Sequence, residues 1–97
     1  MSDKVEVENV NTPGKITRVD AAKYNAMFKA MMQVLPHEAP GMVVKDVIAE
    51  AKKHLPEDLF PGGSTAGWWV KCVQLDLEAK KKITRAEKPP VRLYRLD

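Results

Sequence analysis

The sequence predicts an α+β domain in which three helices precede a C-terminal β-hairpin. Apolar residues recur every three or four positions in three segments, near residues 20–35, 45–54 and 64–81, which indicates amphipathic helices. In residues 83–85 and 91–96, successive side chains alternate between apolar and polar in most positions, which indicates strands. The chain has 97 residues, of which 44% are hydrophobic and 30% charged. This length and composition favour one globular domain over a disordered chain.

The N-terminal residues 1–19 show no helical period, so we expect an arm there and a single domain over residues 20–97. Val5 and Val7 alternate with glutamates, which suits a short strand or an extended arm. Residues 11–14 (Asn-Thr-Pro-Gly) favour a turn, because proline presets φ and glycine accepts a positive φ.

The first helix should begin after Asp20, whose carboxylate can accept a hydrogen bond from a free amide of the first turn. It should end before Pro36, because the residue that precedes a proline is disfavoured in the α region. Its spacing places one apolar face against the core, made of Tyr24, Met27, Phe28, Met31, Met32 and Leu35.

A very short strand over residues 42–44 should lead into the second helix, residues 45–54, which Pro56 stops. In the connector that follows, Leu59 and Phe60 are too apolar for a free loop, so we expect them to fill the core. The predicted core is completed by residues from all three helices: Phe28, Met31, Leu35, Val47, Ile48, Ala51, Val73 and Leu77.

The third helix, residues 64–81, should be capped by Ser64 or Thr65 and should have a broad buried face. Two neighbouring apolar rows form that face: Trp69, Val73 and Leu77 in one, and Trp68, Cys72, Leu75 and Ala79 in the other. Only one of the two adjacent tryptophans is easily buried, and the other either fills a gap beneath the strands or reaches the surface. The polar row that remains consists of Lys71, Gln74, Glu78 and Lys81.

The positive charge of the chain is concentrated at one end. The formal net charge is +3, yet residues 61–97 carry eight Lys or Arg against four Asp or Glu, a net +4. A basic stripe favours a polyanionic partner, although it is also a common solvated face. Most of the excess comes from the helix end and the strands: Lys80, Lys81, Lys82, Arg85, Lys88, Arg92 and Arg95.

Residues suited to catalysis or metal binding are sparse, and we expect neither an enzyme nor a cofactor. His37 and His54 lack a ligand spacing with each other or with Cys72, the only cysteine. Cys72 lies on the apolar side of its helix, so we expect a buried, inert thiol. Residues 61–67 (Pro-Gly-Gly-Ser-Thr-Ala-Gly) lack the lysine of a P-loop, which leaves a turn and a seat for one phosphate at the helix start.

Localisation is predicted from what the chain lacks. No apolar run approaches the roughly 18 residues that span a bilayer, and the N-terminus lacks the apolar region of a signal peptide. We therefore expect a cytoplasmic protein without a membrane partner or a small-molecule substrate.

The order of elements resembles a winged helix-turn-helix domain. Residues 77–85 (Leu-Glu-Ala-Lys-Lys-Lys-Ile-Thr-Arg) resemble the end of a recognition helix entering its wing, with Lys81 where such sequences often have glycine. Residues 41–47 resemble the short first strand and the start of the second helix. From residue 9 to residue 95, the chain also looks like a family of small bacterial proteins of uncharacterised function, on segments such as 9–14 and 67–69.

The winged-helix resemblance implies double-stranded DNA as a partner, with the third helix in the major groove and the wing along the backbone. The alternative is a winged-helix module for protein contacts or a homodimer without DNA-binding activity. Single-strand binding is disfavoured, because it needs several exposed rings and only 6% of the residues are aromatic. Under the DNA interpretation, the contacts come from the helix and the wing: Ser64, Thr65, Lys71, Gln74, Lys81, Lys82, Arg85, Lys88 and Arg92.

Overall fold

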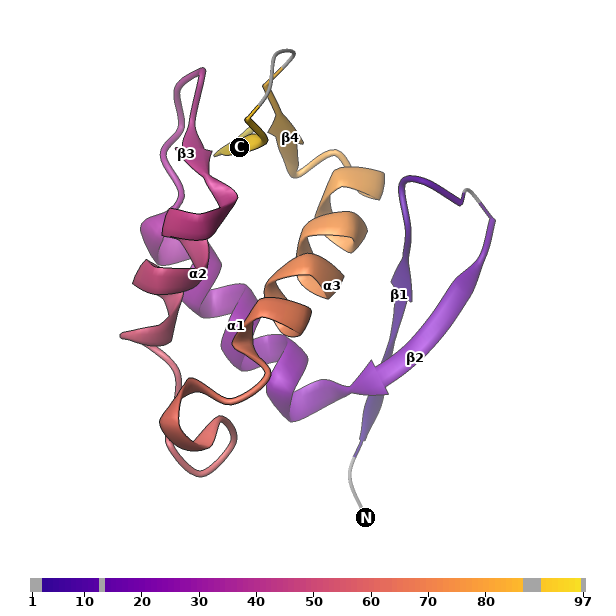
Figure 1. Cartoon of the computed structure of the whole chain (residues 1–97). Coiled ribbons are helices and arrows are strands. Elements are labelled where there is room, and N and C mark those ends of the chain that lie inside the picture. The colour runs from indigo at the N-terminus through magenta and orange to yellow at the C-terminus, as the bar shows by residue number, and fades with distance from the viewer. Residues whose placement is uncertain (1–2, 13, 87–89, 97) are drawn as a thin grey trace.

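The computed structural model describes residues 3–12, 14–86 and 90–96 of the chain (Figure 1). Over these residues it contains three helices and two small antiparallel sheets, which confirms the predicted α+β class. The elements follow one another as β1 (Lys4–Glu8), β2 (Ile16–Asp20), α1 (Ala21–Val34), β3 (Met42–Val43), α2 (Val44–Lys52), the 3-10 turn η1 (Pro61–Gly63), α3 (Ala66–Ala79), β4 (Ile83–Arg85) and β5 (Arg92–Arg95).

The N-terminal segment forms a hairpin, not a single extended arm. The strand expected over Val5 and Val7 is β1, and it pairs antiparallel with β2, which the sequence analysis missed. The register sets Val5 opposite Val19 and Val7 opposite Thr17, so these four side chains share one face of the hairpin. Val7 and Val19 are buried. Because an isolated two-stranded hairpin is marginal in water, this apolar face is what fixes the hairpin to the helices.

Helix α1 follows β2 directly and begins as predicted. The Asp20 carboxylate accepts a hydrogen bond from the Lys23 amide at 3.1 Å, and the helix ends two residues before Pro36. Its buried residues are Met27, Ala30 and Met31, whereas Phe28 is only partly buried. The prediction that Phe28 lies fully in the core was therefore wrong, because the centre of the buried face runs through Met27.

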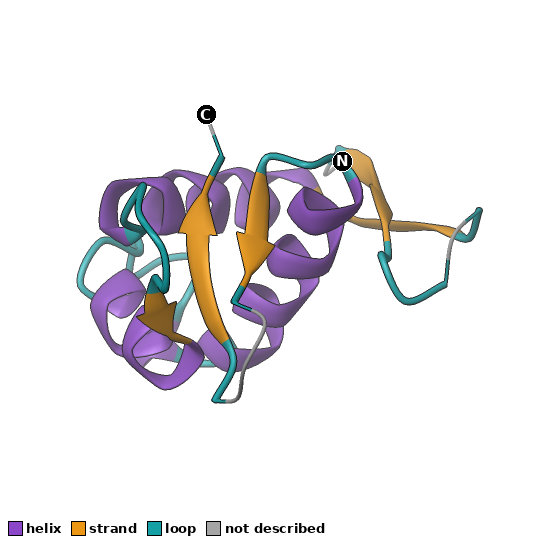
Figure 2. Ribbon diagram, turned by 90° about the horizontal axis from the view of Figure 1, so that it is seen from above, coloured by secondary structure: helices purple, strands orange, loops and turns teal. Residues whose placement is uncertain are grey.

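The C-terminal strands form a three-stranded sheet with β3, in the order β3-β5-β4. The predicted strand at residues 42–44 and the predicted hairpin are thus joined, with Met42 opposite Leu93 and Ile83 opposite Arg95. This sheet lies across one side of the helices, away from the N-terminal hairpin (Figure 2). Its core-facing residues, Ile83 and Leu93, are almost fully buried.

The hydrophobic core lies where the three helices, the sheet and one connector residue meet. Six of the eight predicted core residues are buried, and Phe28 and Ile48 are partly buried. Phe60 is fully buried in the connector between α2 and α3, as predicted, while Leu59 packs partly against the core. The core also contains Val70, Ala66, Ile83 and Leu93.

Both ends of α3 use left-handed backbone. Thr65 occupies the N-cap position with φ 60°, and its hydroxyl donates to the Ser64 carbonyl, so neither predicted cap bonds a helix amide. At the other end, the Lys82 amide donates to the Leu77 carbonyl and the Lys81 amide to Glu78. These two bonds form a Schellman motif, which requires a left-handed residue after the cap. Lys81 takes that conformation with φ 61°.

Candidate functional site

The exposed side of α3 combines an aromatic ring, a cation and an aliphatic side chain. We define the α3 face as Trp68, Lys71 and Leu75, which lie within two turns on one side of the helix. Trp68 is 60% exposed, although the sequence analysis placed it in a buried row; its neighbour Trp69 is buried at 7% exposure. Their ring centroids lie 5.0 Å apart at an interplanar angle of 79°, so the buried ring supports the exposed one.

A groove lies between α3 and the N-terminal hairpin. This hairpin groove has a volume of about 440 Å³. Its apolar floor comes from both sides, with Val7 and Val19 from the hairpin and Trp68, Cys72 and Leu75 from the helix. The polar lining comes from the hairpin strands and their turn: Glu8, Asn9, Thr12, Lys15 and Thr17.

A second hollow of about 430 Å³ lies on the other side of the α3 face, toward α2 and the C-terminal sheet. It shares Lys71 and Leu75 with the hairpin groove. These two residues therefore form a ridge between two depressions. The remaining lining residues are Asn11, Val44, Ile48, Gly67, Gln74, Arg85 and Val91.

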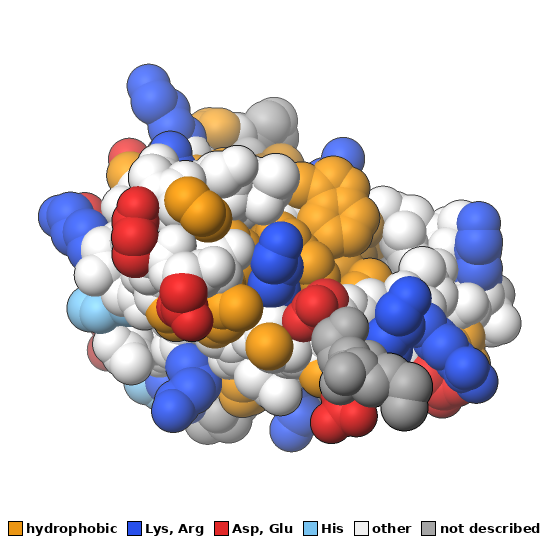
Figure 3. All heavy atoms as spheres, turned by 90° about the horizontal axis from the view of Figure 1, so that it is seen from below, with side chains coloured by type: hydrophobic (Ala, Val, Ile, Leu, Met, Phe, Trp, Pro, Cys, Tyr) orange, Lys and Arg blue, Asp and Glu red, His pale blue; other side chains and the backbone are white. Residues whose placement is uncertain are grey.

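Several large hydrophobic side chains reach the surface, both in these hollows and outside them. Val10, Ile16, Trp68, Val91 and Leu96 are large and exposed. Figure 3 shows hydrophobic side chains gathered on one face of the molecule, with Lys and Arg side chains around them. Apolar area surrounded by charged side chains is typical of surfaces that bind another macromolecule.

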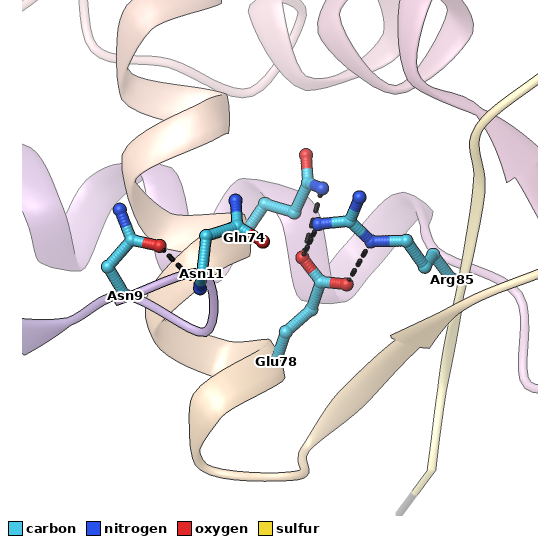
Figure 4. Close-up of polar contacts among 5 residues, drawn as sticks. All are labelled: Asn9, Asn11, Gln74, Glu78 and Arg85. Atoms are coloured by element: carbon cyan, nitrogen blue, oxygen red, sulfur yellow. Dashed lines mark hydrogen bonds and ion pairs between the residues drawn. The ribbon is translucent and has the colours of Figure 1, made fainter. Parts of the chain in front are cut away.

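Gln74, expected to face a DNA base, is buried, with 6% of its surface exposed. Its amide nitrogen donates to Glu78 Oε2 at 3.1 Å. Arg85 binds the same carboxylate with two hydrogen bonds, of 2.6 Å from Nε and 2.9 Å from Nη2 (Figure 4). The prediction of an outward polar row through Gln74 and Glu78 was wrong, because the wing folds back over this part of α3. The Glu78 hydrogen bond also raises the pKa of Arg85.

The other acidic residue of α3 connects three elements. The Asp76 side chain is fully buried and accepts a hydrogen bond from the Glu8 amide at 2.8 Å, from the Tyr24 hydroxyl and from Lys80 Nζ at 2.9 Å. It thus joins β1 and α1 to α3. Burial, followed by the hydrogen bond to Asp76, raises the pKa of Tyr24. Both carboxylates of α3 therefore serve internal contacts and present little charge to a partner.

The remaining residues predicted to contact DNA are spread over the surface. Ser64 and Thr65 are exposed before α3, and Lys81 and Lys82 are exposed after it. Arg92 is partly exposed on β5, and Lys88 lies outside the described residues. Lys71 is exposed and lies on the α3 face. Among the predicted DNA contacts that the structure describes, only Lys71, Gln74 and Arg85 therefore line one hollow together.

The hairpin's contribution to the site was missed in the sequence. The signal was present, because Ile16, Thr17 and Val19 are β-branched and follow a turn. Two such strands on either side of a turn predict a hairpin, and alternation would then have placed Thr17 and Val19 on the same face.

Cys72 lies in the hairpin groove but is poorly suited to act as a nucleophile. Burial, and then the charge of Asp76, raises the pKa of its thiol to about 11. The thiolate, which is the reactive form, is therefore scarce near neutral pH. Over the described part of the chain, no three or more His, Cys, Asp or Glu side chains are grouped to hold a metal ion.

Native Cys72 should react slowly with iodoacetamide at pH 7–8, and its rate should reach half of its maximum only near pH 11. The rate of the unfolded chain should reach half of its maximum near pH 9, at the ordinary thiol pKa. Because folding raises this pKa, the associated stabilisation is complete below the unfolded pKa and is lost as the pH rises through about 11. Mass spectrometry of native and urea-unfolded protein measures both rates; equal rates at pH 7.5 would contradict this assignment.

None of the described helices is both long and apolar enough to cross a membrane.

Comparison with known proteins gives one match. A model of a family of unknown function, DUF6958, matches residues 4–93. The match includes the hairpin, all three helices and β5 as far as Leu93. No curated protein and no solved structure matches the chain significantly.

Proposed function

The chain belongs to the DUF6958 family, whose function is unknown, and from its surface we propose that it is a non-catalytic, cytoplasmic module that binds a partner protein through the α3 face. The observation that carries this proposal is Trp68, which is 60% exposed and lines the hairpin groove. Tryptophan is strongly enriched among the residues that dominate binding energy at protein interfaces. A ring held against a buried neighbour also loses little conformational freedom on binding.

Charge and burial on α3 favour a protein partner over base recognition. Gln74 is buried and its side-chain amide is bonded to Glu78, so it presents little surface to a base edge. Arg85 is held by both oxygens of Glu78, so a phosphate contact would have to break two charge-assisted hydrogen bonds. This leaves Lys71 as the α3-face cation, beside apolar side chains that gain from being covered by a protein.

Duplex DNA remains the second candidate, in a winged-helix-like mode. Lys81 and Lys82 are exposed where α3 meets the wing, and residues 61–97 carry the excess positive charge. The left-handed Lys81 occupies a position where winged-helix sequences often have glycine, the residue that this backbone favours. These features support a backbone contact that is independent of base sequence.

Trp68→Ala should abolish most partner binding while leaving the fold intact. Peptides selected on the wild-type chain from a random displayed library, then synthesised, serve as probes. Their dissociation constants should rise about thirtyfold, since truncation of a tryptophan hot spot costs about 2 kcal/mol or more. Leu96→Ala is the matched control, because Leu96 is also exposed but does not line either hollow. Peptides that bind Trp68→Ala as tightly as the wild type would contradict the proposal.

The DNA alternative is tested on the same proteins with a labelled random duplex at low salt. Under the protein-binding proposal, the anisotropy of the duplex stays unchanged. Binding that weakens with salt, and whose slope falls by about one for each alanine placed at Lys81, Lys82 or Arg92, would establish the DNA interpretation instead.

A further inference from the structure

The hairpin groove supplies a specific chemistry for the proposed partner, and the inference below rests on the proposed function. We propose that this groove receives an extended acidic segment of a partner protein, with one apolar side chain seated against Trp68. The floor of the groove is suited to an apolar side chain. Val7, Val19 and Leu75 form an apolar strip beside Trp68, with both the hairpin and α3 contributing. An apolar side chain placed there would remove the exposed indole from water.

Two lysines at the rim are suited to bind the acidic residues of the segment. Lys15 immediately precedes β2 and Lys71 lies on α3, so the two line the groove from the hairpin side and the helix side. Both are exposed, and neither forms an ion pair with another described residue. Glu8 is the acidic residue of the lining and is itself exposed, so the lining has two lysines against one glutamate. The lining therefore has a net positive charge that attracts carboxylates.

Lys15 and Lys71 differ from other cations of the chain, which form ion pairs. Lys80 is bound to Asp76 at 2.9 Å, and Arg85 to Glu78 at 2.6 Å. On the outer face of the hairpin, Arg18 lies 3.7 Å from Glu6. These three cations are thus paired with carboxylates of the chain, whereas Lys15 and Lys71 are available to a partner.

The shape of the groove favours a segment of polypeptide over a small molecule. Small-molecule sites commonly enclose 70–90% of their ligand. This groove has the hairpin as one wall and α3 as the other, so a ligand inside it would be covered from two sides only. Its side-chain hydroxyls and amide, from Thr12, Thr17 and Asn9, can bond the main chain of an extended segment.

The experiment uses three peptide pools that share one central Leu, Phe or Met and differ only in the flanking residues, which are Asp/Glu, Asn/Gln or Lys. Each pool is selected on the full-length chain, and the recovered peptides are measured by fluorescence anisotropy. We expect recovery from the acidic pool, with binding that weakens as salt increases. Lys15→Glu and Lys71→Glu should each raise the dissociation constant more than tenfold. Lys29→Glu, an exposed lysine on α1 outside the groove, is the matched control.

A charge exchange separates lost binding from lost folding. Peptides from the lysine pool should bind Lys71→Glu better than they bind the wild type, which an unfolded variant could not do. If the dissociation constants of the recovered peptides rise in Trp68→Ala but not in Lys15→Glu or Lys71→Glu, the groove assignment is overturned and the proposed function stands. Peptides that ignore Trp68 as well would overturn both. Self-association of the chain in sedimentation, lost in Lys71→Glu, would make a second copy the occupant and overturn the acidic segment.

Discussion

Asp76→Ala should lower the free energy of unfolding by about 3–5 kcal/mol, the loss expected when one partner of a buried charged network is removed. The Asp76 side chain has no exposed surface and accepts hydrogen bonds from Glu8, Tyr24 and Lys80. Removing it leaves a main-chain amide and a phenol without their acceptor. Lys80, which is partly exposed, can turn to water, so the damage falls mainly on the hairpin and α1.

Urea denaturation measures this loss, and two variants locate its cause. The free energy of unfolding of Asp76→Asn should lie between those of the wild type and Asp76→Ala, because an amide offers one acceptor oxygen where the carboxylate offers two. Asp58→Ala removes an exposed carboxylate from the connector and should change the stability by less than about 0.5 kcal/mol. Hydrogen exchange at the Glu8 amide should accelerate in Asp76→Ala more than exchange within α2. An unchanged Glu8 amide would show that Asp76 does not hold the hairpin.

The consequence for function follows from the position of the hairpin. Val7 and Val19 form one wall of the hairpin groove, and the bond from Glu8 to Asp76 lies next to Val7. A hairpin that detaches from α3 would remove that wall. Stability and the proposed peptide binding are therefore linked through one buried carboxylate.

Local signals predicted the helices well. The carboxylate of Asp20 caps α1 as expected, and α1 ends before Pro36, whereas α2 ends at Lys52, two residues before the end predicted from Pro56. Capping, proline stops and apolar spacing depend on residues within a few positions of each other, so a single sequence contains them. The alternation in residues 83–85 and 91–96 likewise predicted β4 and β5.

The candidate site was harder to predict, because long-range contacts decide which side chains are exposed. Nothing near Gln74 in the sequence indicates that it shares the Glu78 carboxylate with Arg85, since the contact of Arg85 with Glu78 depends on the return path of the wing. Helical periodicity also leaves Trp68 and Trp69 nearly equivalent, at about 100° apart around the helix. Phe60 contributes to the burial of Trp69, because its ring packs edge-on against the Trp69 ring with the two centroids 6.4 Å apart.

Phe60→Ala should destabilise the protein by about 3–5 kcal/mol, through lost transfer energy and the cavity left behind. Phe60 is fully buried although it lies in a connector, and its amide bonds to the Pro56 carbonyl at 2.9 Å. The sequence predicted this burial from the apolar character of residues 59 and 60. Loss of the ring should also loosen Trp69, which supports the exposed Trp68.

Phe28→Ala is the comparison that makes this result informative, because it removes the same atoms from a side chain that is only partly buried. Its ring stacks on Tyr24 at 6.3 Å and keeps contact with solvent, so its loss should cost clearly less than the loss of Phe60. Urea midpoints rank the two variants, and near-ultraviolet circular dichroism reports on Trp69. A larger loss from Phe28→Ala would place the centre of the core on α1 and remove the connector's role in orienting the α3 face.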